Sequence, residues 1–310
     1  MNHIESSLAS SPLITPAPVV CPVHPRWRLV LSVFKLRIGV LIMFTALAGV
    51  AIVPHEPMTT PWQTLALALS VLLASASAGA FNQYMEADSD RLMARTRTRA
   101  FASGALRRDP RWLVLMLGML VGAVTMAGLI TNWTAALFVL LGALTYALVY
   151  TIGLKRRTPW NIVIGGAAGS FSVLAGAAAV SPQMGPLAWL LALALLLWTP
   201  PHFWSLAIAN RDQYAAAGVP MLPVVVGPGR AARIVHWSTV ALVAATLVPL
   251  GFGAGWAYGL GAMLGGAQFL RKTFVLAREP ARARAMAAFF ASMMQLSALI
   301  LGVWLDAALR

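Results

Sequence analysis

Long apolar stretches alternate with short polar stretches along almost the whole chain. About 20 apolar residues are enough to cross a bilayer as a helix. Nine stretches meet this requirement, and they cover residues 29–53, 65–85, 112–130, 133–152, 160–180, 187–209, 233–251, 254–270 and 286–308. The eighth is the weakest, because it is short and rich in glycine. The pattern predicts an all-α integral membrane protein with a single transmembrane domain over residues 26–310.

The composition excludes a soluble protein of this size. Of the 310 residues, 59% are hydrophobic and only 10% are charged, and the mean hydropathy is +0.77. Residues 1–25 are polar and do not resemble a cleaved signal peptide, so we expect a disordered tail there. The only cysteine, Cys21, lies in this tail, which excludes an internal disulfide and a cysteine-based metal cluster.

The basic residues are distributed unequally between the two sides of the predicted membrane domain. Of the 23 Lys and Arg residues, 22 lie before the first span, at its start or on alternate loops, and the opposite loops have none. The positive-inside rule therefore predicts a cytoplasmic N-terminus. This orientation signal explains much of the net charge of +14, and no nucleic-acid partner is expected. It does not explain why acidic residues join the arginines in one loop.

That loop follows the second predicted span and begins with a polar motif. Asn82, Glu86 and Asp90 are spaced four residues apart, so on a helix they share one face. Stacked carboxylates at a membrane boundary are costly unless a divalent or strongly basic group neutralises them. Mg²⁺ is typically bound by one or two carboxylates together with substrate phosphates, and the arginines downstream suit such phosphates. The motif therefore predicts a metal-diphosphate site at a membrane surface.

A second polar cluster follows the fourth span and contains Lys155, Arg156 and Asn161. The two basic residues could hold a diphosphate, or they could only snorkel and set the topology. Lys35 and Arg37, at the start of the first span, leave the same two alternatives open.

The sixth span contains a histidine and two prolines in the stretch Trp198-Thr-Pro-Pro-His-Phe-Trp204. Such features within a membrane usually line a cavity. His202 could ligate a metal or a haem iron, although a hydrogen bond within the bundle is the simpler interpretation. Asp212, beyond the end of this span, is interpreted as a solvated acid when it is taken alone.

Together these motifs resemble the haem-modifying branch of the UbiA superfamily of intramembrane prenyltransferases. The resemblance covers residues 28–300 and is strongest in three segments. These segments are Asn82 to Arg99, Tyr150 to Gly166, and Leu197 to Ala207 with Ala217 to Val225. Within them, the stretches Leu154-Lys-Arg-Arg-Thr-Pro159 and Trp198-Thr-Pro-Pro-His-Phe203 resemble the haem branch specifically. It implies a bundle of nine spans around a central cavity. It also implies transfer of a farnesyl group from farnesyl diphosphate to a vinyl group of haem b, in a bacterial inner membrane.

The resemblance also implies roles for individual residues. Asn82, Glu86 and Asp90 would hold Mg²⁺ and diphosphate with support from Asp88, and His202 would lie near the porphyrin as a candidate axial ligand. The residues expected to bind the substrates are Lys35, Arg37, Arg95, Arg99, Lys155, Arg156, Asn161, Asp212 and Tyr214.

This chain departs from the family pattern at several of these positions. Glu86 replaces an aspartate, and Asn210 and Gln213 stand where the family has a lysine and an aspartate before the tyrosine, here Tyr214. The usual Pro-Pro of the fifth span is Phe171-Ser-Val173, and Leu36 replaces a proline.

Three alternatives therefore remain beside a farnesyltransferase. The first is a catalytically silent haem-binding subunit or a terminal oxidase assembly partner. The second is a prenyltransferase with a quinone or aromatic acceptor. The third is a transporter, which is weaker because the acids lie at the membrane edge and not at its midplane.

Overall fold

The computed structural model describes residues 26–54 and 60–309, and over this part of the chain it contains thirteen α-helices, a π-helix, a 3₁₀-helix and no strand. The predicted tail, residues 1–25, lies outside the described residues. The elements are α1 (Arg26–Val33), α2 (Leu36–Ile52), α3 (Pro61–Arg91), α4 (Pro110–Ile130), α5 (Trp133–Leu144), η1 (Thr145–Leu154), α6 (Asn161–Gly165), α7 (Ala167–Val180), α8 (Pro186–Ala209), α9 (Arg211–Ala216), α10 (Leu222–Val226), α11 (Pro228–Leu247), η2 (Val248–Phe252), α12 (Trp256–Arg278) and α13 (Arg282–Leu309).

The all-helical membrane architecture is confirmed, but the number of nine spans is not. Within the described residues, seven helical runs are long and apolar enough to cross a membrane. The count becomes eight if α1 and α2, which meet at a bend of 43°, form one span. The remaining segment is α12, the counterpart of the weakest predicted span. It is a helix of 23 residues that is not apolar enough to be counted among the seven.

Local sequence signals explain where several of the helices begin. The hydroxyl of Thr60 accepts a hydrogen bond from the backbone N–H of Gln63, whose side chain in turn accepts one from the backbone N–H of Thr60, so α3 begins with a capping box. The side chains of Asp109 and Asn132 cap α4 and α5 more simply, by accepting hydrogen bonds from the backbone N–H groups of Arg111 and Ala135. These polar residues end the loops and satisfy backbone donors that the start of a helix leaves free.

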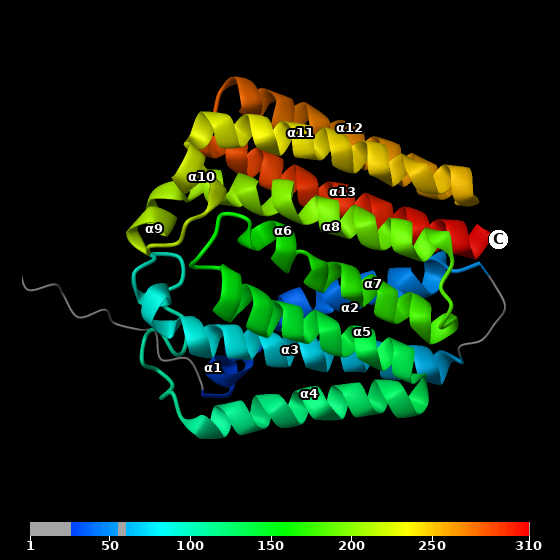
Figure 1. Cartoon of the computed structure of the whole chain (residues 1–310), viewed down its shortest axis with the longest axis horizontal. Helices are drawn as coiled ribbons and strands as arrows, with labels where there is room; N and C mark the ends of the chain where they lie inside the picture. Colours follow the sequence, from blue (N-terminus) through cyan, green and yellow to red (C-terminus); the bar gives the residue numbers. More distant parts are fainter. Residues whose placement is uncertain (1–25, 55–59, 310) are drawn as a thin grey trace, which may run out of the picture.

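The long helices run side by side in a single bundle (Figure 1). α8, α11, α12 and α13 form one half, and α3, α4, α5 and α7 form the other, while α2 contacts both α7 and α13. Close packing of α2 on α7 depends on two glycines. A Cβ atom added at Gly176 would overlap the carbonyl oxygen of Ala46, and one added at Gly49 would overlap that of Val173. Small residues of this kind allow the backbones of membrane helices to approach closely.

The loops that join α3 to α4, η1 to α6, α8 to α11 and α12 to α13 all lie at one end of the bundle, on the left of Figure 1. We call this the basic end, because these four connections and the helix ends beside them carry most of the basic residues that follow α2. The two halves of the bundle are brought together there through loops and short helices, and the polar motifs of the sequence lie at the same end.

Candidate functional site

The centre of the site is the last three turns of α3. Asn82, Glu86 and Asp90 lie on the buried face of this helix, with 2%, 4% and 1% of their surfaces exposed. Two carboxylates buried in a membrane protein are costly unless they are paired or bind a metal. The spacing of four residues therefore has the consequence expected from the sequence, because all three oxygen-bearing groups face the interior of the bundle.

Each of the three groups meets a cation from a different segment of the chain. The Lys155 ammonium lies 2.5 Å from Glu86 Oε1, and an Arg99 guanidinium nitrogen lies 2.8 Å from Asp90 Oδ2. Lys35, at the break between α1 and α2, donates to Asn82 Oδ1 at 2.5 Å. The cluster thus joins α3 to the break between α1 and α2, to the loop that follows α3, and to the loop that follows η1.

A fourth cation, Arg156, donates to the hydroxyl of Ser89 at 2.7 Å. The site therefore holds four cations, Lys35, Arg99, Lys155 and Arg156, against the two carboxylates of Glu86 and Asp90. The positive charge in excess suits a polyanionic ligand such as a diphosphate, since charge-assisted hydrogen bonds to phosphate oxygens are strong.

One oxygen of each carboxylate has no partner among the described residues. Glu86 Oε2 and Asp90 Oδ1 are buried and make no hydrogen bond. Within the described residues no group of three His, Cys, Asp or Glu side chains could hold a metal by itself. Two bare carboxylate oxygens nevertheless fit Mg²⁺, which completes its coordination with waters and substrate phosphates. The residues that fit this ion are Glu86 and Asp90, with the Asn82 amide oxygen beside them.

The π-helix η1 supplies a second wall of the site that the sequence did not predict. Hydrogen bonds from residue i to i+5 replace the usual pattern over ten residues, and such segments are frequent at functional sites. The rings of Tyr146 and Tyr150 stack with their centroids 5.6 Å apart. The Lys35 and Lys155 ammoniums each lie 5.8 Å from the centroid of one of these rings, within cation–π range.

Thr151, on the same π-helix, fixes the orientation of the Asn82 amide. Asn82 Nδ2 donates to the hydroxyl of Thr151 at 3.0 Å, and that hydroxyl donates to the carbonyl of Tyr146 at 2.8 Å. The amide oxygen of Asn82 is thereby turned towards Lys35. The only sequence signal for this wall is the spacing of three residues before Lys155. Tyr150 follows Tyr146 by four positions, and Thr151 follows it by five.

Asn161 holds the loop that carries two of the cations. It is fully buried, and its Nδ2 donates to the carbonyls of Thr158 at 2.7 Å and Lys155 at 3.3 Å. The Oδ1 atom is buried and has no hydrogen-bond partner in the described chain. Asn161 therefore acts on the site through the backbone of the loop that begins at Lys155.

Three residues that the sequence placed with the site lie away from its centre. Asp88 is exposed and pairs with Arg108 at 2.9 Å and with Arg91 at 3.2 Å. Arg37 and Arg95 are exposed, and neither side chain forms an ion pair within the described residues. Their expected contacts with diphosphate stay predictions.

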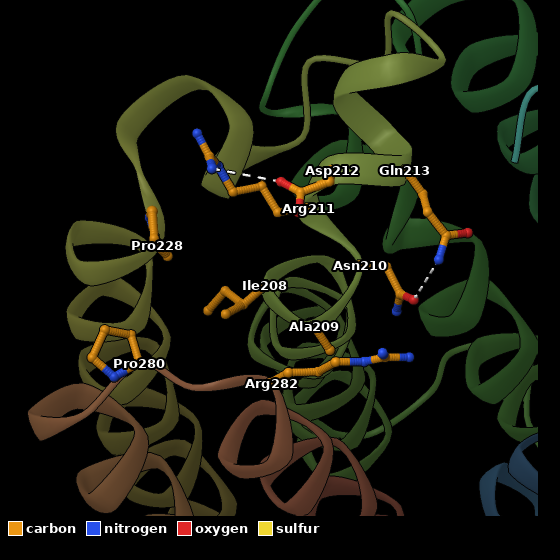
Figure 2. A pocket seen from close by; sticks show the side chains of 9 residues that line it. All are labelled: Ile208, Ala209, Asn210, Arg211, Asp212, Gln213, Pro228, Pro280 and Arg282. Atoms are coloured by element: carbon orange, nitrogen blue, oxygen red, sulfur yellow. Dashed lines mark hydrogen bonds and ion pairs between the residues drawn. The ribbon is translucent and has the colours of Figure 1, made fainter. Parts of the chain in front are cut away.

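The segment after α8 approaches the same end of α3 through neutral groups. Gln213 Oε1 accepts a hydrogen bond from the backbone N–H of Arg95 at 3.4 Å, and Gln213 Nε2 donates to Asn210 Oδ1 at 3.4 Å. Asp212 has a side chain that is 97% exposed, and it lies 3.7 Å from Arg211 (Figure 2). The Asp212 carboxylate therefore lies on the surface beside Arg211, and its expected contact with a substrate stays a prediction. Tyr214 is buried in the apolar core beneath this segment.

A cavity of about 420 Å³ opens beside this segment, where α8 and α9 meet the start of α11 and the junction of α12 with α13 (Figure 2). Its lining residues are Ile208, Ala209, Asn210, Arg211, Asp212, Gln213, Pro228, Pro280 and Arg282. The cavity belongs to the basic end, and the amide of Gln213 connects its wall to the loop that follows α3. The central cavity implied by the family resemblance stays a prediction.

His202 joins α8 to α13 and is buried among aromatic rings. Its ring stacks on Trp198 with the centroids 4.1 Å apart and on Phe289 at 4.5 Å. Its Nδ1 is 2.6 Å from the hydroxyl of Ser292, and the Trp198 indole N–H donates to the carbonyl of Ser292 at 2.9 Å. The contact with Ser292 is a hydrogen bond within the bundle, which was the simpler interpretation of the sequence. Its place near a porphyrin stays a prediction.

Comparison with known proteins gives a consistent result over nearly the whole chain. The model of the UbiA prenyltransferase family matches residues 42–294. The chain is 51% identical to Protoheme IX farnesyltransferase 2 of Paramagnetospirillum magneticum, in an alignment that covers 90% of the chain and 96% of that relative. It is 41% identical to Protoheme IX farnesyltransferase of Rhizorhabdus wittichii, with 86% of the chain and 89% of the relative covered.

Solved structures share the fold at low sequence identity. A digeranylgeranylglyceryl phosphate synthase matches with a TM-score of 0.75 and 17% identity, covering 92% of this chain and 99% of its own. A UbiA homologue from Archaeoglobus fulgidus bound to DMAPP and Mg²⁺ matches with a TM-score of 0.68 and 16% identity, covering 87% and 99%. The helical bundle seen here is therefore the one that these proteins share.

Proposed function

The chain belongs to the UbiA prenyltransferase family, and from this premise we propose that it transfers the farnesyl group of farnesyl diphosphate to a vinyl group of haem b, giving haem O. The names of its curated relatives support this donor and acceptor. The structural observation that carries the proposal is the pair of buried carboxylates, each with one bare oxygen, among four cations at the end of α3.

Glu86 and Asp90, with Asn82 beside them, would hold Mg²⁺. The related structure bound to DMAPP and Mg²⁺ supports a metal in this fold, and the two unpartnered oxygens support its place in this chain. When it is bound, the ion supplies electrostatic stabilisation of the negative charge on the departing diphosphate.

Lys35, Arg99, Lys155 and Arg156 would bind the diphosphate oxygens and orient the allylic carbon of the donor. These residues stabilise the charge that grows on the diphosphate as the allylic C–O bond breaks, since the electron pair of that bond leaves with the phosphate oxygen. The vinyl π electrons of haem b then form the new C–C bond. A water molecule adds to the resulting porphyrin-side cation and releases one proton. No covalent enzyme intermediate is required.

The charge pattern supports a location in a bacterial cytoplasmic membrane with the basic end facing the cytoplasm. In that orientation the buried acid pair lies near the aqueous side from which a soluble diphosphate would leave. The neutral side chains of Asn210 and Gln213 provide no second acid pair, so the proposal uses the Glu86–Asp90 pair alone for the metal.

The test is an assay of the purified protein with haem b, farnesyl diphosphate and Mg²⁺, in which haem O is identified by mass. We expect product that disappears when EDTA is added and returns when Mg²⁺ is restored. Haem binding without product would favour the catalytically silent subunit, because Asn210 and Gln213 depart from the family pattern. Prenylation of a quinone or an aromatic acid, with haem b unchanged, would favour the other acceptor class.

A further inference from the structure

The cavity at the basic end has the composition of a site for an organic anion. Arg211 and Arg282 lie on its walls, and Ile208, Ala209, Pro228 and Pro280 give it apolar surface. Arg282 extends past Ala209, and in the view of Figure 2 its guanidinium points to the side on which Asn210 and Gln213 lie. Apolar walls with a few directed polar groups are typical of small-molecule sites.

Arg282 is available to such a ligand because its own neighbourhood provides no anion. The acid of the α12–α13 junction, Glu279, is already paired with Arg284. The first turn of α13 contains no acidic residue, and Arg282 forms no ion pair within the described part of the chain. Arg211 is only partly engaged, with Nε donating to the carbonyl of Pro223 at 3.3 Å and a terminal nitrogen 3.7 Å from Asp212.

The anion expected in this cavity is one that binds without a metal. The only acid on its wall is Asp212, whose side chain is 97% exposed and lies next to Arg211. A diphosphate is better served by the cluster around Glu86 and Asp90, which has four cations and two bare carboxylate oxygens. Two guanidiniums without an inward carboxylate suit carboxylate ligands, which arginine binds in a bidentate way.

We infer that this cavity receives the propionate carboxylates of haem b, with Arg282 and Arg211 as the residues that bind them. The inference rests on the proposed function, since haem b is the acceptor there. Haem b carries its two propionates on one edge of an otherwise apolar ring. Burying a carboxylate is costly, so these groups are expected at the polar end of the bundle and not within it. The Gln213–Arg95 contact joins the cavity wall to the loop beyond Asp90, which places both substrate sites at the same end.

The experiment measures haem affinity and turnover separately in Arg282→Ala, Arg211→Ala and the double variant. Haem b is titrated by its Soret absorbance, and the same titration is repeated with haem b dimethyl ester, in which both carboxylates are blocked. We expect each single variant to weaken binding of haem b by about tenfold, the equivalent of one charge-assisted hydrogen bond. The dimethyl ester should bind the wild type and the double variant equally, and Arg282→Lys should recover part of the affinity.

Arg284→Ala is the matched control, because Arg284 lies two residues from Arg282, pairs with Glu279 and does not line the cavity. It should bind haem b as the wild type does. The inference is wrong if both cavity variants bind haem b as tightly as the wild type does. It is also wrong if the variants prefer haem b over its dimethyl ester by the same factor as the wild type. It is also wrong if they raise the KM for farnesyl diphosphate and not that for haem b. Because binding is read without turnover, a protein that binds haem b in this way but forms no haem O would contradict only the proposed reaction.

Discussion

Lys155 and Glu86 lie 69 positions apart in the chain, and the Lys155 ammonium is 2.5 Å from one oxygen of the Glu86 carboxylate, while the other oxygen has no hydrogen-bond partner among the described residues. Both side chains are largely buried. A buried ion pair contributes little net stability compared with well-packed apolar residues, because both charges lose their hydration. The pair is therefore better explained by what it can bind than by what it adds to folding.

The first prediction concerns the two carboxylates. Glu86→Gln and Asp90→Asn keep the shape of each side chain but remove the charge that would hold Mg²⁺. We expect each to lower the rate of haem O formation by about 10²–10³-fold, the usual cost of losing one electrostatic contact to the reacting group. The rate is measured at saturating haem b, and a size-exclusion profile establishes that the variants are folded.

The control for this experiment is Glu279→Gln, which removes an acid from an exposed loop at the same end of the bundle. Its rate should equal that of the wild type. If Glu86→Gln and Asp90→Asn both turn over at the wild-type rate, these carboxylates are not the metal site, and the observation that carries the proposed function fails.

The second prediction concerns Asn161 as a positioning residue. Asn161→Ala removes the hydrogen bonds to the carbonyls of Lys155 and Thr158, so the loop that presents Lys155 and Arg156 loses its support. We expect the KM for farnesyl diphosphate to rise by about tenfold, since a lost buried hydrogen bond costs about 1–3 kcal/mol. Steady-state kinetics with each substrate varied in turn provide the measurement.

A purely structural role for Asn161 would give a different result. General loosening of the bundle would lower kcat or change the KM for both substrates together, whereas displacement of the loop should leave the KM for haem b unchanged. A KM for farnesyl diphosphate that does not change would show that the loop keeps its place without Asn161.

The third prediction separates two acids that are close in sequence but differ in surroundings. Asp88 lies two positions from both Glu86 and Asp90, yet it is exposed and pairs with Arg91 and Arg108 on the surface. Exposed ion pairs contribute about 0–1 kcal/mol, so Asp88→Asn should leave the rate within about threefold of the wild type. A loss comparable to that of Asp90→Asn would mean that Asp88 supports the metal site, as the family resemblance implied.

The sequence was sufficient to predict the helices and one face of the site because both depend on local periodicity. Every predicted span has a helical counterpart, and the spacing of Asn82, Glu86 and Asp90 placed them on one buried face. The number of spans was less certain, because α12 combines glycines with charged residues at its end and is not apolar enough to be counted with the others.

The partners of these residues could not be predicted, because they depend on how distant segments pack. No local pattern indicates that Lys155 pairs with Glu86, or Lys35 with Asn82, across 69 and 47 positions. The π-helix η1 was missed because ten apolar and polar residues before Lys155 also fit an α-helix. The direction of Asp212, which points away from Gln213, depends on how the short helix α9 leaves the end of α8.

The fourth prediction tests the packing of α2 on α7, where the backbones of the two helices approach closely. A methyl group at Gly176 would overlap the carbonyl oxygen of Ala46, and the backbone there cannot move as a flexible side chain would. Gly176→Ala should therefore lower the free energy of unfolding by about 1–3 kcal/mol, as overpacking of a close interface does. Thermal unfolding in detergent, followed by circular dichroism, gives the measurement.

Gly169→Ala is the matched control on the same helix, because a Cβ atom there would have no atom within 4 Å. Alanine is a better helix former than glycine by about 1 kcal/mol, so this variant should unfold at the same temperature as the wild type or a higher one. The two variants make the same chemical change, and only the contact with α2 distinguishes them. If both unfold at the wild-type temperature, the α2–α7 interface tolerates a methyl group, and the close approach at Gly176 is not required for the stability of the bundle.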